Sequence, residues 1–126
     1  MNWILDKARP ICPQICELIC VAIANGEFSA GEKLSSVRDV ALCAGVNPNT
    51  VQKSFEELER RGVIYSVRCS GWYVNENTDA ATQELRAIRI KKTEEYLLAM
   101  TQLGCNLDDI IKHIHEVKEA IDERTS

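Results

Sequence analysis

The sequence predicts a mainly α protein with a small β-hairpin, and three observations favour that class. Apolar residues recur at steps of three and four over most of the 126-residue chain, which is the period of amphipathic helices. Two short β-branched and aromatic runs, at residues 63 to 67 and 72 to 74, interrupt this period. A polar, unpatterned stretch at residues 75 to 79 separates them from a second helical region, predicted to be a C-terminal antiparallel helical hairpin.

The first three elements are predicted to be helices with clear start and stop signals. The first covers residues 11 to 24, where apolar side chains line one face. Ser36 is predicted to cap the second helix, and Gly45 to end it. Asn47 is predicted to cap the third, with Pro48 at the first helical position, where its missing N–H has no cost. Two short helices joined this closely indicate a helix-turn-helix.

The two β-prone runs follow the third helix directly, and the link at residues 68 to 71 makes them a hairpin. Three helices followed by a two-stranded hairpin is the order of a winged helix-turn-helix. In that arrangement the second helix of the turn enters the major groove of DNA, and its first residues reach base edges. Residues 1 to 76 are therefore predicted to form a winged helix-turn-helix DNA-binding domain, with double-stranded DNA as partner.

The start of the third helix carries side chains suited to reading DNA. Asn49 and Gln52 offer the paired donor and acceptor that match adenine, Thr50 offers a hydroxyl and a methyl, and Lys53 can meet phosphate or guanine. The opposite face is predicted to be buried. It consists of Val51, Phe55 and Leu58.

Residues 77 to 126 are predicted to be a two-helix dimerisation tail. One helix ends near Gly104 and the next is capped by Asn106, so the two form an antiparallel pair. Their apolar stripes are too large for two helices to hide alone, which predicts a homodimer through the C-terminal helices.

Three runs resemble the N-terminal DNA-binding domain of GntR-family bacterial transcription regulators: GEKLSSVRDVA at residues 31 to 41, VNPNTV at 46 to 51 and ELERRGVI at 57 to 64. The resemblance covers roughly residues 10 to 74, and the tail is similar to the two-helix dimerisation tail of the YtrA subgroup. It implies DNA contacts from the opening of the second helix, the start of the third, and a wing that reaches the minor groove. The implied DNA-binding residues are Ser36, Arg38, Asn49, Thr50, Lys53, Arg68 and Gly71.

The chain departs from the family pattern at three positions. Ser35 stands where the family usually has Pro, and in the wing Cys69 replaces a Gly while Trp72 replaces a small residue. Because Cys tolerates positive φ poorly, a reshaped wing tip is expected, and this would move Arg68, which lies next to Cys69. For Trp72 we favour packing under the hairpin over contact with sugar and base.

The formal net charge of −4 argues weakly against nucleic-acid binding, but the charged residues are distributed unevenly along the chain. Residues 1 to 77 carry eight Lys/Arg and nine Asp/Glu, net −1, whereas residues 78 to 126 carry seven and ten, net −3. The span from residue 33 to 53 has three basic residues against one acidic. DNA binding with steep salt dependence is therefore expected.

Six cysteines without a signal peptide are expected to be thiols in a reducing cytosol. Cys12, Cys16 and Cys20 form a ridge on the first helix, but a metal would need a fourth ligand from elsewhere, so small buried or edge-of-core thiols are predicted. No metal or other cofactor is expected. The sequence shows no membrane-length apolar run and no nucleophile–base set, which predicts a cytoplasmic protein that is not an enzyme.

The leading hypothesis is a sequence-specific transcription regulator, a repressor, that acts as a homodimer on a near-palindromic operator. The YtrA-like tail extends the implication to the genes of an ABC-type transporter operon, whereas no small-molecule effector can be assigned. Two alternatives stay open. One is a winged-helix protein-interaction module that has lost DNA binding, motivated by the altered wing and the acidic balance; the other is a thiol- or metal-responsive regulator that uses the cysteine ridge.

Overall fold

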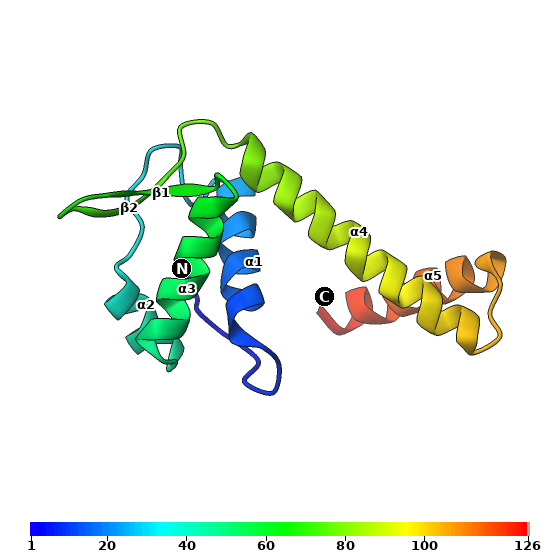
Figure 1. The fold of residues 1–126 in the computed structure, drawn as a ribbon. Helices are drawn as coiled ribbons and strands as arrows, with labels where there is room; N and C mark the ends of the chain where they lie inside the picture. The colour runs from blue at the N-terminus through cyan, green and yellow to red at the C-terminus, as the bar shows by residue number, and fades with distance from the viewer. Residues whose placement is uncertain (126) are drawn as a thin grey trace. The chain divides into compact units, whose positions relative to one another are not determined.

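The computed structural model describes residues 1–125, which form three short helices, a hairpin and two longer helices (Figure 1). The predicted fold class is confirmed. In chain order the elements are α1 (Ile11–Ala24), α2 (Val37–Ala44), α3 (Pro48–Arg60), β1 (Ile64–Val67), β2 (Gly71–Val74), α4 (Asp79–Gln102) and α5 (Leu107–Thr125).

Side-chain caps set the ends of α2 and α3 as predicted. The Ser36 hydroxyl accepts a hydrogen bond from the Asp39 N–H at 3.1 Å, which satisfies one of the free donors at the start of α2. Gly45 ends that helix in the left-handed conformation, with φ of 69°. The Asn47 side chain then accepts from the Asn49 N–H at 2.8 Å and starts α3. The turn between the two helices is therefore short and fixed at both ends.

The core lies between α1, α3 and the hairpin, and Phe55 is at its centre. Its side chain is fully buried, together with Ile15 and Ile19 from α1. The Trp72 ring from β2 meets the Phe55 ring edge-on, with centroids 5.6 Å apart. The prediction that Trp72 packs under the hairpin is confirmed, and this packing ties the wing to the helix that precedes it.

The hairpin is extended by the chain segment that leads into α2. β1 and β2 pair antiparallel, with Ile64 opposite Val74. On the other edge of β2, the Leu34 N–H donates to the Trp72 carbonyl at 2.8 Å and the Val74 N–H donates to the Glu32 carbonyl at 2.9 Å. Residues 31 to 34 therefore act as a short third strand, and the segment that precedes α2 is hydrogen-bonded to the wing.

The contacts divide the chain into two compact units, residues 1–88 and the residues from 89 onward. Ala81 and Leu85, in the first part of α4, are buried in the core of the first unit. The structural division thus falls inside α4, beyond the boundary predicted at residue 76; the division into a DNA-binding and a dimerisation part stays a prediction. In the second unit, the Asn106 side chain caps α5 by accepting from the Asp109 N–H at 2.9 Å.

Replacing Phe55 with Ala should lower the free energy of unfolding by about 3–5 kcal/mol, because a fully buried aromatic side chain is lost and a cavity is left. Urea denaturation followed by circular dichroism measures this change. Leu42→Ala is the matched control: Leu42 is 76% exposed, so the change should stay within about 0.5 kcal/mol. Equal effects of the two substitutions would contradict the assignment of Phe55 to the centre of the core.

Candidate nucleic-acid interface

The start of α3 presents an exposed polar surface because the other face of the helix is buried. Val51, Phe55 and Leu58 have no exposed surface, which fixes how the helix is turned. Asn49 and Lys53 are consequently exposed, and Thr50 is half-buried between them. The predicted reading residues of α3 therefore lie together on its first two turns. Lys53 makes no ion pair within the described residues.

The opening of α2 places one cation on the surface. Arg38 is exposed, and its guanidinium has no carboxylate partner among residues 1–125. Ser36 is also exposed, but its hydroxyl oxygen already accepts from the Asp39 N–H. A hydroxyl can still donate its own proton, so Ser36 remains able to bond an acceptor such as a phosphate oxygen while it caps the helix.

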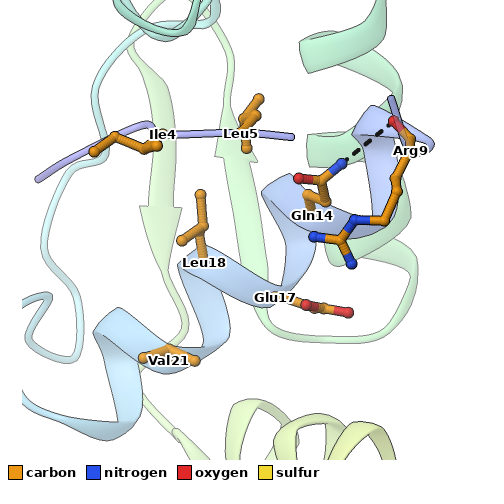
Figure 2. A pocket seen from close by; sticks show the side chains of 7 residues that line it. All are labelled: Ile4, Leu5, Arg9, Gln14, Glu17, Leu18 and Val21. Atoms are coloured by element: carbon orange, nitrogen blue, oxygen red, sulfur yellow. Dashed lines mark hydrogen bonds between the residues drawn. The ribbon is translucent and has the colours of Figure 1, made fainter. Parts of the chain in front are cut away.

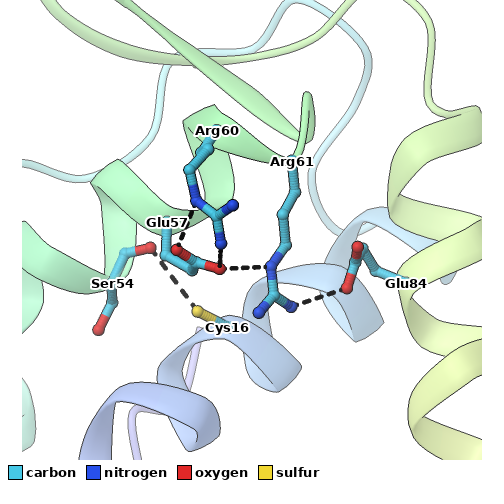
Figure 3. A network of polar contacts seen from close by, with 6 residues as sticks. All are labelled: Cys16, Ser54, Glu57, Arg60, Arg61 and Glu84. Carbon is cyan, nitrogen blue, oxygen red and sulfur yellow. Dashed lines mark hydrogen bonds and ion pairs between the residues drawn. The ribbon is translucent and has the colours of Figure 1, made fainter.

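The two arginines at the end of α3 are engaged with carboxylates, unlike Arg38. Arg60 and Arg61 both bond the Glu57 carboxylate, and Arg61 also reaches Glu84 of α4 at 2.8 Å (Figure 3). Hydrogen bonds from the two guanidinium groups hold the pKa of Glu57 below its ordinary value. Arg61 therefore connects the end of α3 to α4, whereas Arg60 is paired within α3 itself. Neither arginine is counted among the candidate DNA contacts.

The wing tip has an unusual backbone at the position where Cys replaces the family's Gly. Cys69 takes a positive φ of 63°, a conformation that costs a side chain with a Cβ more than it costs glycine. The Ser70 N–H closes the turn onto the Val67 carbonyl at 3.0 Å. Arg68 is exposed at this tip and has no ion-pair partner among the described residues. The structure therefore presents Arg68 at the end of the hairpin.

Sequence reasoning assigned no role to Lys33, which the structure places beside the wing. Lys33 bridges to Tyr73 of β2, and a Cβ added at Gly71 would lie 3.2 Å from the Lys33 Cε. The Lys33 side chain therefore lies along the wing at Gly71. The sequence did give one signal, the excess of basic residues between residues 33 and 53. Lys33 contributes to this excess, but no individual role was predicted for it. Lys33 joins the candidate cations of this surface.

The cysteine ridge is part of the core. Cys16 and Cys20 are buried, and the Cys16 thiol donates to the Ser54 carbonyl at 3.6 Å (Figure 3). Burial raises the pKa of Cys16 to about 12 and that of Cys20 to about 11. The predicted core thiols are confirmed for these two, with Cys12 half-buried at the edge of the core. Among residues 1–125, no group of three or more His, Cys, Asp or Glu side chains is arranged to hold a metal.

A shallow pocket lies between the N-terminal segment and α1 (Figure 2). Its volume is about 200 Å³, below the range of about 300–1,000 Å³ in which proteins enclose drug-sized ligands. Its lining mixes apolar and polar side chains: Ile4, Leu5, Arg9, Gln14, Glu17, Leu18 and Val21. Within this lining, the Gln14 side chain donates to the Arg9 carbonyl at 3.3 Å. The pocket supports no effector assignment.

Taken together, a capped helix-turn-helix, an exposed polar start of α3 and a hairpin fastened to both define a winged-helix DNA-binding regulator. Comparison with known proteins gives the family. The profile of "Bacterial regulatory proteins, gntR family" matches residues 13–74. The chain belongs to the GntR family, and is a DNA-binding transcriptional regulator and not an enzyme. Among the described residues, no helix is both long and apolar enough to cross a membrane.

Relatives match the chain beyond the winged-helix domain. The HTH-type transcriptional repressor YtrA of Bacillus subtilis (strain 168) is 33% identical over 112 residues, which cover 88% of this chain and 86% of that protein. A GntR family transcriptional regulator from Listeria monocytogenes has a solved structure with 37% identity and a TM-score of 0.78, covering 89% of this chain and 98% of the other. The structure of AraR(DBD) in complex with operator ORX1 covers 56% of this chain and 86% of the other, with 27% identity and a TM-score of 0.51.

Thiol labelling should separate the cysteines by burial. At pH 8, iodoacetamide should modify the exposed Cys43 and Cys69 readily and leave Cys16 and Cys20 unmodified. With pKa values of about 12 and about 11, only about one Cys16 in 10⁴ and one Cys20 in 10³ is a thiolate at that pH. Peptide mass spectrometry measures the labelling, and a sample in urea, where all sites react, is the control. Equally fast labelling of Cys16 and Cys43 in the folded protein would contradict a core role for the ridge.

Proposed function

We propose that the chain acts as a homodimeric repressor that binds a near-palindromic DNA operator. The observation that carries this proposal is the exposed polar start of α3 on a helix whose other face is fully buried. A helix held rigidly by its core presents base-reading side chains with defined geometry. AraR(DBD) was solved in complex with an operator, which supports the same use of the winged-helix domain here.

The proposed contacts divide by chemistry. Asn49 reads a base edge, adenine by preference, because its amide offers one donor and one acceptor. Lys53, Arg38 and Ser36 fix the register on phosphates, with Arg38 also able to bond guanine in two places. Thr50, half-buried, contributes its hydroxyl or methyl. At the wing, Arg68 enters the minor groove, and Gly71 lets the backbone approach closely.

Dimerisation is proposed through the second unit, where α5 leaves an apolar stripe exposed. Ile111, Ile114, Val117 and Ile121 recur at steps of three and four and are each between 42% and 55% exposed. Such a stripe on a helix is stabilised by a partner, and a second copy of the chain offers the same surface. Two copies would present two α3 helices to successive half-sites of the operator.

Repression and the regulated genes rest on the relatives. The B. subtilis relative YtrA is a repressor, and it matches this chain over both the winged helix and the tail. We therefore propose repression rather than activation, in the cytoplasm where the DNA lies. The proposed target, an operon for an ABC-type transporter, rests only on the resemblance of the tail to the YtrA subgroup.

Arg38→Ala and Asn49→Ala test the proposed contacts. Asn49→Ala should weaken operator binding by about 1–3 kcal/mol and relax the preference at one base pair, while Arg38→Ala should also reduce the salt dependence when its partner is a phosphate. Fluorescence anisotropy on a duplex selected from a random library by the wild-type chain measures both effects. Arg60→Ala is the matched control: it removes a cation paired with Glu57 on the same domain, so operator affinity should be unchanged.

Two outcomes would contradict this proposal in different ways. Unchanged binding in both interface variants would refute the assigned contacts while leaving DNA binding in place. Failure of the wild-type chain to select any duplex, together with salt-insensitive capture of a protein partner, would favour the alternative of a winged-helix interaction module.

A double substitution on α5 tests dimerisation. Ile114→Asp with Ile121→Asp should convert the dimer to a monomer, because a buried unpaired carboxylate at an apolar interface is strongly unfavourable. Analytical ultracentrifugation measures the mass. Lys112→Asp places the same carboxylate on the other side of α5 and should leave the dimer intact. A dimer that persists in the double variant would rule out this stripe as the interface.

A further inference from the structure

The segment before α1 is built into the fold and is not a loose arm. Trp3 is buried in the core of the first unit. The Gln14 side chain accepts from the Asp6 N–H at 2.8 Å and donates back to the Asp6 carbonyl at 2.9 Å. The Asp6 carboxylate in turn accepts from the Ala8 N–H at 3.0 Å and pairs with Arg9. These bonds hold the turn at residues 6–10 in one conformation.

This turn directs Lys7 onto the helix-turn-helix. A Cβ added at Gly45, the residue that ends α2, would lie 3.0 Å from the Lys7 Nζ. The Lys7 ammonium therefore lies directly over the turn between α2 and α3. Lys7 is exposed, and within residues 1–125 it has no carboxylate partner, whereas the neighbouring Arg9 is paired with Asp6. Figure 1 shows the N-terminal loop at the same end of the first unit as this turn.

The position of Gly45 brings this cation close to the edge of the proposed interface. Gly45 lies two residues before Asn47, the cap of α3, and two residues of chain span at most about 7 Å. In the proposed complex the start of α3 enters the major groove, and this would bring the Lys7 ammonium beside the groove wall. That wall consists of phosphates, spaced so that the duplex carries one negative charge per about 1.7 Å of axis.

We propose that Lys7 is a DNA phosphate-contacting residue, which extends the operator interface from the helix-turn-helix to the N-terminal segment. This inference rests on the proposed function. Lys7 contributes affinity without sequence preference, because an ammonium at a phosphate reads no base. A purely structural role is the competing explanation, since a cation over the last carbonyls of α2 also interacts favourably with the helix dipole. The two roles predict different effects: loss of a phosphate contact changes the salt dependence of DNA binding, whereas loss of a helix-end contact lowers the stability of the protein without DNA.

The experiment compares Lys7→Gln with Arg9→Gln, a control that removes an equal charge from the same turn but from a side chain paired with Asp6. The probes are the duplex selected by the wild-type chain and a scrambled duplex of equal composition. For Lys7→Gln, the slope of log affinity against log salt should fall by about 0.9 per subunit, and affinity at 0.1 M salt should fall about 8-fold per subunit on both duplexes. Arg9→Gln should leave the slope unchanged, and Lys7→Arg should restore it.

The possible results separate the inference from the proposed function. An unchanged slope in Lys7→Gln, with the wild-type chain still binding its duplex, overturns the Lys7 contact alone. A fall in the thermal midpoint of unfolding without a change in slope assigns Lys7 to the end of α2 and also overturns the contact. If the wild-type chain selects no duplex, the proposed function fails and the Lys7 contact fails with it.

Discussion

The burial of Phe55 is the interaction on which the other parts of the first unit depend. Its ring is fully buried in the core that includes residues of α1, and it packs at a steep angle against the ring of Trp72 from the wing. Phe55 thus helps to fix the rotation of α3, together with Val51 and Leu58, and it also ties the hairpin to that helix. Because side chains on a helix follow its rotation, the exposed positions of Asn49 and Lys53 are a consequence of what the opposite face buries.

Local signals in the sequence predict the helices and their ends well. Ser36, Gly45 and Asn47 act on backbone groups within a few residues, so the caps they form can be recognised without knowing the rest of the fold. The same holds for α5, which Asn106 starts. The positions of Asn49 and Lys53 followed equally from the helical period, since the apolar residues of α3 define its buried face.

Contacts between distant parts of the chain could not be predicted in this way. The pairing of residues 31 to 34 with β2 leaves no periodic pattern, because so short a segment shows no alternation. The sequence alone therefore did not predict that Lys33 lies beside the wing, or that Lys7 lies over Gly45. The extent of the first unit could not be predicted for the same reason. Ala81 and Leu85 belong to a long helical pattern, and that pattern does not show which core they are buried in. In each case the missing information is a tertiary contact.

The hydrogen bonds that join residues 31 to 34 to β2 have a consequence for how specificity can change during evolution. The segment that forms them continues directly into α2, so the wing and the opening of α2 share one continuous piece of backbone. A substitution that shifts the hairpin is therefore expected to shift the opening of α2, which includes Arg38, as well. The contacts proposed for the wing and for Arg38 would then change together, and the wing of such a protein would be difficult to transfer alone to another scaffold.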